Sequence, residues 1–212
     1  MGFQDRLELL AGLGPVRHFY HQVDYWAWRV GGAGRTPFRA KAELLAGEVT
    51  DTRRTFVETG TYRGDMLARL RGDFDRLYSI ERDSVLYRAA VHRFLNAPHV
   101  TVYQGDSARA LGRVLAEVTG PCVVWLDAHP ISGEPGEVPL LSELRTLLEH
   151  RGGGHRVAID DIRLFSGEAG WPSLAEIVGL LHRSGRVAHL SMRDDMMTFT
   201  VTEGNSPTAG DE

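Results

Sequence analysis

The sequence predicts an α/β fold: a doubly wound, mostly parallel sheet of seven strands that ends in an antiparallel hairpin and has helices on both faces. Three observations predict it. Short apolar runs alternate with helical patterns from residue 55 to residue 181, as in parallel strands joined by crossover helices. Acidic residues follow the first five of these apolar runs. The last two runs are separated only by Arg193-Asp194-Asp195, and so short a turn joins antiparallel strands.

The length and composition are those of a globular protein with one main domain. The chain has 212 residues, of which 42% are hydrophobic and 25% charged, so it can bury a core without disulfides. Its net charge of −4 offers no strongly basic surface, and we expect neither nucleic acid nor a membrane as a partner. The single cysteine, Cys122, lies in an apolar run, as a buried thiol in a reducing compartment would. The N-terminus shows no signal peptide, so we expect a cytoplasmic protein.

Residues 1–50 are expected to form a helical N-terminal extension. Its segment 16–29 is crowded with aromatic residues, and it is expected to pack on the main domain or on a second subunit, which weakly suggests a homodimer. It could instead form a wall over a substrate. His18 and His21 have the spacing of metal ligands on a helix, but no partner ligand is near them in sequence, so a structural role is expected.

The main domain is expected at 51–202, and residues 203–212, which are rich in Gly, Ser, Pro and acids, are expected to be a disordered tail. The predicted strands lie at 55–58, 77–80, 100–103, 122–126, 157–159, 187–191 and 196–201. The predicted helices lie at 37–49, 65–70, 84–95, 108–118, 140–149 and 174–181. Asp83 is a suitable N-cap for the helix that begins at Ser84.

The first strand of the main domain is followed by a glycine turn, Thr59-Gly60-Thr61-Tyr62-Arg63-Gly64, and then directly by a helix. The glycines allow backbone N–H groups to approach a ligand, and the helix N-terminus adds a partial positive charge. Glu58 at the strand end would repel a phosphate, and no Gly-Lys-Ser/Thr sequence follows the turn. The turn therefore suits a zwitterionic or cationic ligand.

Acids follow five predicted strands. Glu58, Glu81, Asp106, Asp127 and the pair Asp160-Asp161 each stand at or just after a strand end. Ligands bind beyond the carboxyl ends of the strands in doubly wound sheets. One such acid could cap a helix, but capping alone does not explain five, so we expect a ligand cleft at this edge.

Residues 50–202 resemble the class I S-adenosylmethionine-dependent methyltransferases, which have a Rossmann-like fold. The glycine turn resembles their first motif, although it reads Gly-Thr-Tyr-Arg-Gly instead of the glycine-richer Gly-X-Gly-X-Gly. Glu81 matches the acid that binds both ribose hydroxyls, and Asp106-Ser107 match the positions beside the adenine. The resemblance implies S-adenosylmethionine as cofactor, with contacts from Glu58, Thr59, Gly60, Tyr62, Gly64, Glu81, Asp106, Ser107 and Asp127.

A narrower resemblance is to the metal-dependent O-methyltransferases that act on sugar hydroxyls of natural products. Asp127, Asp160 and Asp161 match their metal ligands, which implies Mg²⁺ or another divalent cation. His129 matches their general base, and Asp127 shares the catalytic site. The alternatives are that the aspartates cap a turn or bind backbone, and that His129 binds the metal or only contacts the substrate. The loop 130–139 is expected to act as a lid or substrate wall.

Together these features predict methyl transfer to a hydroxyl of a small molecule, with a metal to orient the hydroxyl and His129 to remove its proton. Two alternatives share the fold: a metal-independent small-molecule methyltransferase, and a cofactor-binding protein without activity. A nicotinamide-dependent oxidoreductase is disfavoured by Glu58 and by the terminal hairpin.

Overall fold

The structure is a computed structural model that describes residues 25, 28–30, 36–129, 138–168 and 170–204. Several predicted features therefore lie outside the described residues: His18, His21, most of the aromatic segment, the loop at 130–137 and the tail from residue 205.

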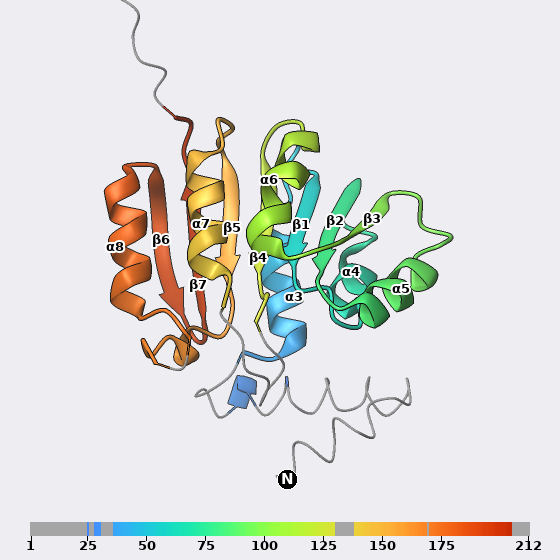
Figure 1. The fold of residues 1–212 in the computed structure, drawn as a ribbon, viewed down its shortest axis with the longest axis horizontal. Helices are drawn as coiled ribbons and strands as arrows, with labels where there is room; N and C mark the ends of the chain where they lie inside the picture. Colours follow the sequence, from blue (N-terminus) through green and yellow to red (C-terminus); the bar gives the residue numbers. More distant parts are fainter. Residues whose placement is uncertain (1–24, 26–27, 31–35, 130–137, 169, 205–212) are drawn as a thin grey trace, which may run out of the picture.

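The described residues form a seven-stranded sheet in the order β3-β2-β1-β4-β5-β7-β6, which confirms the predicted fold class (Figure 1). The strands are β1 Thr55–Thr59, β2 Arg76–Glu81, β3 Val100–Gln104, β4 Cys122–Leu126, β5 His155–Ile159, β6 Val187–Arg193 and β7 Met196–Val201. Strands β1 to β5 are parallel. Strand β7 lies between β5 and β6 and is antiparallel to both, so the terminal hairpin folds back into the sheet.

The strand register aligns the carboxyl ends of the central strands. Thr59 pairs with both Ile80 and Leu126, and Leu126 pairs with Ile159. The residues that follow these aligned positions therefore emerge at one edge of the sheet, and they are Gly60, Glu81, Asp127 and Asp160.

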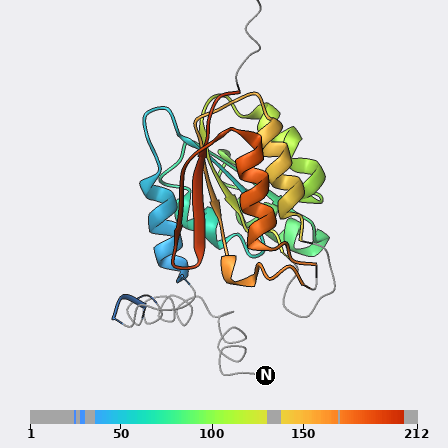
Figure 2. The same cartoon turned by 90° about the vertical axis from the view of Figure 1, so that its left-hand side faces the viewer.

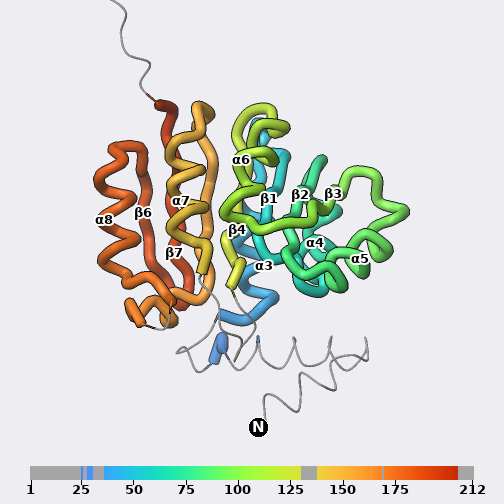
Figure 3. Tube along the Cα trace, viewed as in Figure 1, coloured from blue at the N-terminus to red at the C-terminus, as the bar shows by residue number. Residues whose placement is uncertain are grey.

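Helices cover both faces of the sheet (Figures 1 and 2). They are α3 Phe38–Gly47, α4 Asp65–Leu70, α5 Ser84–Arg93, α6 Ser107–Glu117, α7 Leu140–Glu149 and α8 Leu174–Ser184, with a short 3₁₀ turn, η1, at Ile162–Leu164. Successive side chains of a strand point to opposite faces. Val57 therefore joins the apolar cluster under α6, α7 and α8, while Phe56 joins the cluster under α3 and α4. The Cα trace shows the same arrangement of helices on the two faces of the sheet (Figure 3).

Helix α3 lies within the predicted N-terminal extension but shares the core of the main domain. Ala42 and Leu45 are fully buried in the cluster that contains Phe56. The helix begins after Pro37, whose fixed φ and missing N–H are tolerated at a helix start. The division at residue 50 remains a prediction, since most of residues 1–35 lie outside the described part.

Local signals explain the helix starts. Asp83 caps α5 as predicted, because its Oδ1 accepts from the N–H groups of Val85 (2.7 Å) and Leu86 (2.8 Å). Ser173 and Glu176 form a reciprocal capping box at α8. Across the described ranges, no helix combines the length and the apolar character that crossing a membrane requires.

Candidate functional site

The glycine turn after β1 is held against the end of β4. Gly60 has a φ of +84°, and a Cβ at this position would lie 2.7 Å from the carbonyl oxygen of Asp127. Gly64 has a φ of +70°, and a Cβ there would lie 2.8 Å from the ring of Phe94. Both positions therefore require glycine for conformation and for space. The turn and the end of β4 are therefore in close contact.

Glu81 ties this turn to the end of β2. Its Oε2 accepts from the N–H of Tyr62 (2.7 Å), and its Oε1 accepts from the N–H of Asp83 (2.8 Å). Tyr62 has a φ of 48°, which is uncommon for a residue other than glycine. Each carboxylate oxygen can accept two hydrogen bonds, so each oxygen of Glu81 keeps one acceptor position.

Glu58 is buried beneath the turn, with 1% of its surface exposed. Its Oε1 accepts from the hydroxyl of Ser79 (2.7 Å), but its Oε2 has no hydrogen-bond partner among the described residues. Burial raises the pKa of Glu58 well above its ordinary value, although Ser79 opposes this, and the nearby charges of Asp127 and Glu81 raise it further. A cationic ligand group at this position would satisfy the carboxylate.

Asp106 and Ser107 stand at the start of α6. They follow β3, the strand that lies beside β2 in the sheet. The carboxylate of Asp106 accepts from the N–H of Ala108 (3.0 Å), so it caps the helix. Ser107 is buried beside Glu143 of α7, a residue that the sequence did not single out. Burial raises the pKa of Glu143 to about 7, while the hydroxyls of Ser107 and Thr59 oppose the rise. Neither oxygen of Glu143 has a hydrogen bond of ordinary geometry within the described part of the chain.

The ends of β4 and β5 bring together a cluster of potential metal ligands: Asp127, His129 and Asp161. One ligand atom from each lies within 4.8 Å of the others. His129 Nε2 is 3.6 Å from Asp127 Oδ1 and 3.6 Å from Asp161 Oδ2. Burial raises the pKa of Asp127 well above its ordinary value, and the charge of Asp160 adds to the rise. Burial would also raise the pKa of Asp161, but His129, Lys41 and Arg163 outweigh it and hold that pKa below its usual range.

Asp160 and Asp161 contact different groups in the structure. Its Oδ2 forms an ion pair with Lys41 of α3, and its Oδ1 accepts from the N–H of Asp161 (2.8 Å). Asp161 has a φ of 54°, and this left-handed conformation turns the chain between the two aspartates. Asp161 Oδ1 also accepts from Arg163 (2.8 Å), which in turn contacts Asp195 in the β6–β7 turn. Arg163 thus adds a positive charge to the cleft.

A small pocket lies beside this cluster, lined by Asp127, His129, Glu143 and Asp160 together with apolar side chains of β4, α7 and the segment 165–171. Its volume is about 10 Å³, room for about one water-sized group. The rings of His129 and Trp171 are 5.5 Å apart, and those of Trp171 and Phe165 are 6.1 Å apart. Aromatic side chains therefore form one wall next to His129.

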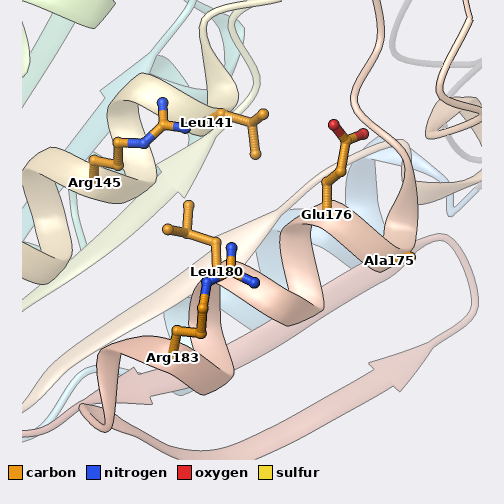
Figure 4. Close-up of a pocket in the computed structure, with 6 residues that line it drawn as sticks. All are labelled: Leu141, Arg145, Ala175, Glu176, Leu180 and Arg183. Atoms are coloured by element: carbon orange, nitrogen blue, oxygen red, sulfur yellow. The ribbon is translucent and has the colours of Figure 1, made fainter.

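A roomier hollow of about 350 Å³ lies between α7 and α8 (Figure 4). Its lining comes from Leu141, Arg145, Ala175, Glu176, Leu180 and Arg183. None of these is a predicted site residue, and Glu176 already accepts hydrogen bonds from Ser173 in the capping box. We therefore place the functional site at the strand ends, where buried polar atoms lack partners among the described residues.

Sequence reasoning missed the contributions of Lys41, Glu143 and Trp171 to this site. The helix carrying Lys41 was predicted, but its contact with Asp160 joins residues 119 positions apart. Glu143 lies on a helix whose periodicity indicates packing, and Trp171 lies in the irregular segment before α8. Nothing local in the sequence marks either side chain as facing the cleft. The contributions of these three residues become visible only in the tertiary structure.

No protein-family model matches the sequence, and no curated protein matches it significantly. Solved structures do share the fold. The O-methyltransferase TomG from Streptomyces achromogenes, involved in tomaymycin synthesis and solved with S-adenosylmethionine, has a TM-score of 0.60 at 18% identity over 87% of this chain and 89% of TomG. An O-methyltransferase from Bacillus cereus in complex with S-adenosylhomocysteine has a TM-score of 0.57 at 15% identity, covering 87% of this chain and 90% of the other.

The same fold also occurs in the 23S rRNA methyltransferase ErmE, with a TM-score of 0.52 at 13% identity over 84% of this chain and 72% of ErmE. The fold neighbours thus act on acceptors of different kinds, so the fold does not fix the acceptor. The expectation that nucleic acid is excluded as a partner is therefore not supported. The strand order and these likenesses together show that the protein has the fold of the class I S-adenosylmethionine-dependent methyltransferases.

Proposed function

We propose that the protein transfers a methyl group from S-adenosylmethionine to a hydroxyl of a small molecule, with a divalent cation held beside the cofactor. One observation carries the proposal. The glycine turn of the cofactor motif lies against the cluster of potential metal ligands, since a Cβ on Gly60 would lie 2.7 Å from the Asp127 carbonyl oxygen. A cofactor on the turn and an acceptor at the cluster would therefore be neighbours, as methyl transfer requires.

The residues of the turn fit this cofactor. S-adenosylmethionine carries an ammonium group and a sulfonium group, and Glu58 offers a buried carboxylate oxygen without a hydrogen-bond partner among the described residues. Gly60 and Gly64 leave the backbone of the turn open to close approach. The remaining acceptor positions of Glu81 would bind the two ribose hydroxyls. Asp106 and Ser107 would border the adenine.

The cluster fits a hard divalent cation such as Mg²⁺ or Mn²⁺. The residues that would hold it are Asp127, Asp161 and His129, whose ligand atoms lie within 4.8 Å of one another. A cation bound there would lower the pKa of an acceptor hydroxyl and orient it. Asp160 faces Lys41 instead, so its expected role as a direct ligand is the least supported of the three aspartates.

His129 would take the proton of the acceptor hydroxyl as the oxygen attacks the methyl carbon. In this displacement the new O–C bond forms, the C–S bond breaks and its electron pair stays on sulfur, which yields a methyl ether and S-adenosylhomocysteine. Asp127 and Asp161 would stabilise the resulting imidazolium, since each lies 3.6 Å from Nε2. The same nitrogen cannot bind a cation and accept this proton, so the two roles of His129 are alternatives that experiment must separate.

The charge of the site favours a small acceptor over nucleic acid. Asp127, Asp160 and Asp161 converge at the cleft, and Lys41 and Arg163 offset only part of their charge. Proteins that bind nucleic acid present positive charge to its phosphates, whereas this cleft would repel them. The aromatic wall at Trp171 and Phe165 suits a ring-bearing molecule.

One observation favours a second candidate, methyl transfer without a metal. Lys41 already supplies a cation to the acid cluster, and it acts on the charge of all three aspartates. In that case His129 alone would activate the acceptor. A chelator would then leave turnover unchanged, whereas metal-assisted transfer stops when the cation is removed.

Calorimetric titration with S-adenosylhomocysteine, in Mg²⁺ and again in EDTA, tests the proposal. We expect micromolar binding in both buffers, and a loss of about tenfold or more in Glu81→Ala, because hydrogen bonds to a charged group are lost. Glu149→Gln, which alters an exposed acid on α7, is the matched control and should bind like the wild type. Absence of binding in both buffers would overturn the proposal.

A further inference from the structure

The N-terminal helix α3 sends one lysine into the acid cluster. Lys41 is the only lysine in the chain; the other basic side chains counted with it are arginines. Its side chain is 8% exposed, and lysine is almost never so buried unless it is paired. Nζ forms an ion pair with Asp160 Oδ2 and lies 3.6 Å from Asp161 Oδ1. All other cationic side chains of this type in the chain are arginines, whose planar guanidinium is larger than the compact ammonium of lysine.

The packing of α3 keeps this ammonium in place. Ala42 and Leu45, on the same helix, are fully buried against the sheet. The N–H of Lys41 bonds to the carbonyl of Pro37 (3.0 Å) at the helix start. The packing of α3 therefore fixes the backbone position from which the Lys41 side chain reaches Asp160.

The two aspartates after β5 differ in what their oxygens face. Both oxygens of Asp160 are engaged within the chain, Oδ2 by Lys41 and Oδ1 by the N–H of Asp161. Asp161 instead directs Oδ1 to Arg163 and leaves Oδ2 facing His129. Of these two aspartates, only Asp161 belongs to the group of mutually close ligand atoms within the described residues.

We propose that Lys41 is a positioning residue that withholds Asp160 from the metal and so restricts its carboxylate ligands to Asp127 and Asp161. This inference rests on the proposed metal-assisted function. With Asp160 neutralised by Lys41, the two remaining carboxylates carry two negative charges, which match one divalent cation. Arg163 contacts both Asp161 and Asp195, so its single positive charge is offset by the charge of Asp195, which lies outside the ligand set. Without Lys41, Asp160 is free to join the ligand set, and the site holds one more negative charge.

The test measures Mn²⁺ binding by calorimetry and by electron paramagnetic resonance, without any need for the acceptor. Lys41→Met should bind Mn²⁺ about tenfold more tightly than the wild type, because a positive charge is removed and a carboxylate is released. Adding D160N to K41M should return the affinity to within about threefold of the wild type, because Asp160 is not a ligand there. Asp161→Asn should lose most of the affinity. Arg39→Met, which removes an exposed cation from the same helix, is the matched control and should change nothing.

Two results would overturn the inference. One is a Lys41→Met protein that is folded, as judged by its thermal unfolding, and binds Mn²⁺ no more tightly than the wild type. The other is a loss of affinity in the K41M/D160N protein as large as that in Asp161→Asn, which would make Asp160 a ligand. The double variant carries no buried charge from this pair, so it decides the question even if Lys41→Met alone fails to fold.

A direct readout comes from the side chain itself. Because Lys41 is the only lysine, ¹⁵N-lysine labelling yields a single side-chain ammonium signal in the NMR spectrum. We expect this signal to persist when Mg²⁺ is added, since the pair with Asp160 is retained. Its loss on Mg²⁺ binding would show that the cation displaces Lys41 and would overturn the inference. A wild-type protein that binds S-adenosylhomocysteine but no Mn²⁺ would instead refute the metal in the proposed function.

Discussion

At the scale of single residues, the proposed function gives His129 one of two roles in activating the acceptor. Its Nε2 lies 3.6 Å from one oxygen each of Asp127 and Asp161, a position open to a base and to a metal ligand. His129→Ala should lower kcat by about 10²-fold to 10⁴-fold if the residue is the base, with Mn²⁺ affinity unchanged. If it is a ligand, kcat and Mn²⁺ affinity should fall together. Single-turnover rates and Mn²⁺ titration of the same variant separate the two roles, and a wild-type rate would exclude both.

Glu143 predicts a stability effect that depends on pH. Its pKa is raised to about 7 from 4.5, so the folded state holds the proton more tightly than the unfolded state. The stability that this provides is complete below the unfolded pKa and is lost as the pH rises through about 7. Glu143→Gln should not show this loss. The difference in free energy of unfolding between Glu143→Gln and the wild type should therefore increase by about 2 kcal/mol, in favour of the variant, as the pH rises from about 5 to about 8.

Urea unfolding at a series of pH values measures this difference. Glu149→Gln, on the exposed side of the same helix, should track the wild type at every pH. A constant difference between Glu143→Gln and the wild type would show that Glu143 ionises in the folded protein as it does in the unfolded chain.

At the scale of elements, the glycine turn between β1 and α4 lies against the end of β4. Gly60→Ala should destabilise the protein by about 2 kcal/mol or more, because φ is +84° and the new Cβ would meet the Asp127 carbonyl. The same change should abolish micromolar binding of S-adenosylhomocysteine, since the turn must shift. Thermal unfolding and calorimetry measure the two effects.

Gly120→Ala is the control for backbone strain alone. Gly120 has a similar φ of +81°, but a Cβ at this position would have no atom within 4 Å among the described residues. The variant should lose stability through strain and keep its affinity for S-adenosylhomocysteine. Equal ligand affinity in both alanine variants would mean that the contact between the turn and β4 does not shape the cofactor site.

At the scale of the whole molecule, stability in acid depends on a buried histidine at the far end of the sheet. His155 begins β5, is 1% exposed, and its Nδ1 accepts from the N–H of Cys122 (3.2 Å). Burial lowers its pKa from 6.5 to about 4, and His150 and Arg186 add to the fall. The unfolded chain therefore binds the proton more readily, and stability is lost as the pH falls from 6.5 towards 4.

From about pH 7.5 to about pH 5 this loss amounts to about 2 kcal/mol. Glu143 acts in the opposite sense over part of the same range, so the wild type should show a shallow net dependence. Glu143→Gln should steepen the loss in acid, and His155→Gln should remove it. Chemical unfolding of both variants across this range checks the signs, and a His155→Gln protein as acid-sensitive as Glu143→Gln would contradict the assignment.

The sequence alone determined the fold class and the position of the glycine turn and most acids at the strand ends. Alternating apolar runs and helical patterns are local, so strands β1 to β5 and the terminal hairpin could be predicted without any contact information. Glu81, Gly60 and Asp127 could be placed at one edge because parallel strands share the direction of their carboxyl ends. The same reasoning predicted that Asp127, Asp160 and Asp161 converge at this edge, whereas the ligand atoms that lie within 4.8 Å of one another belong to Asp127, His129 and Asp161.

Only the tertiary structure decided how the acids divide their roles. The sequence treats Asp160 and Asp161 as an equivalent pair, but the left-handed φ of Asp161 turns their side chains apart. Lys41 comes from a helix 119 residues before Asp160, and its pairing depends on how α3 packs against the sheet. Glu143 belongs to the buried face of α7, where periodicity predicts an apolar residue. Such contacts join side chains that are far apart in the chain, and local patterns carry no information about them.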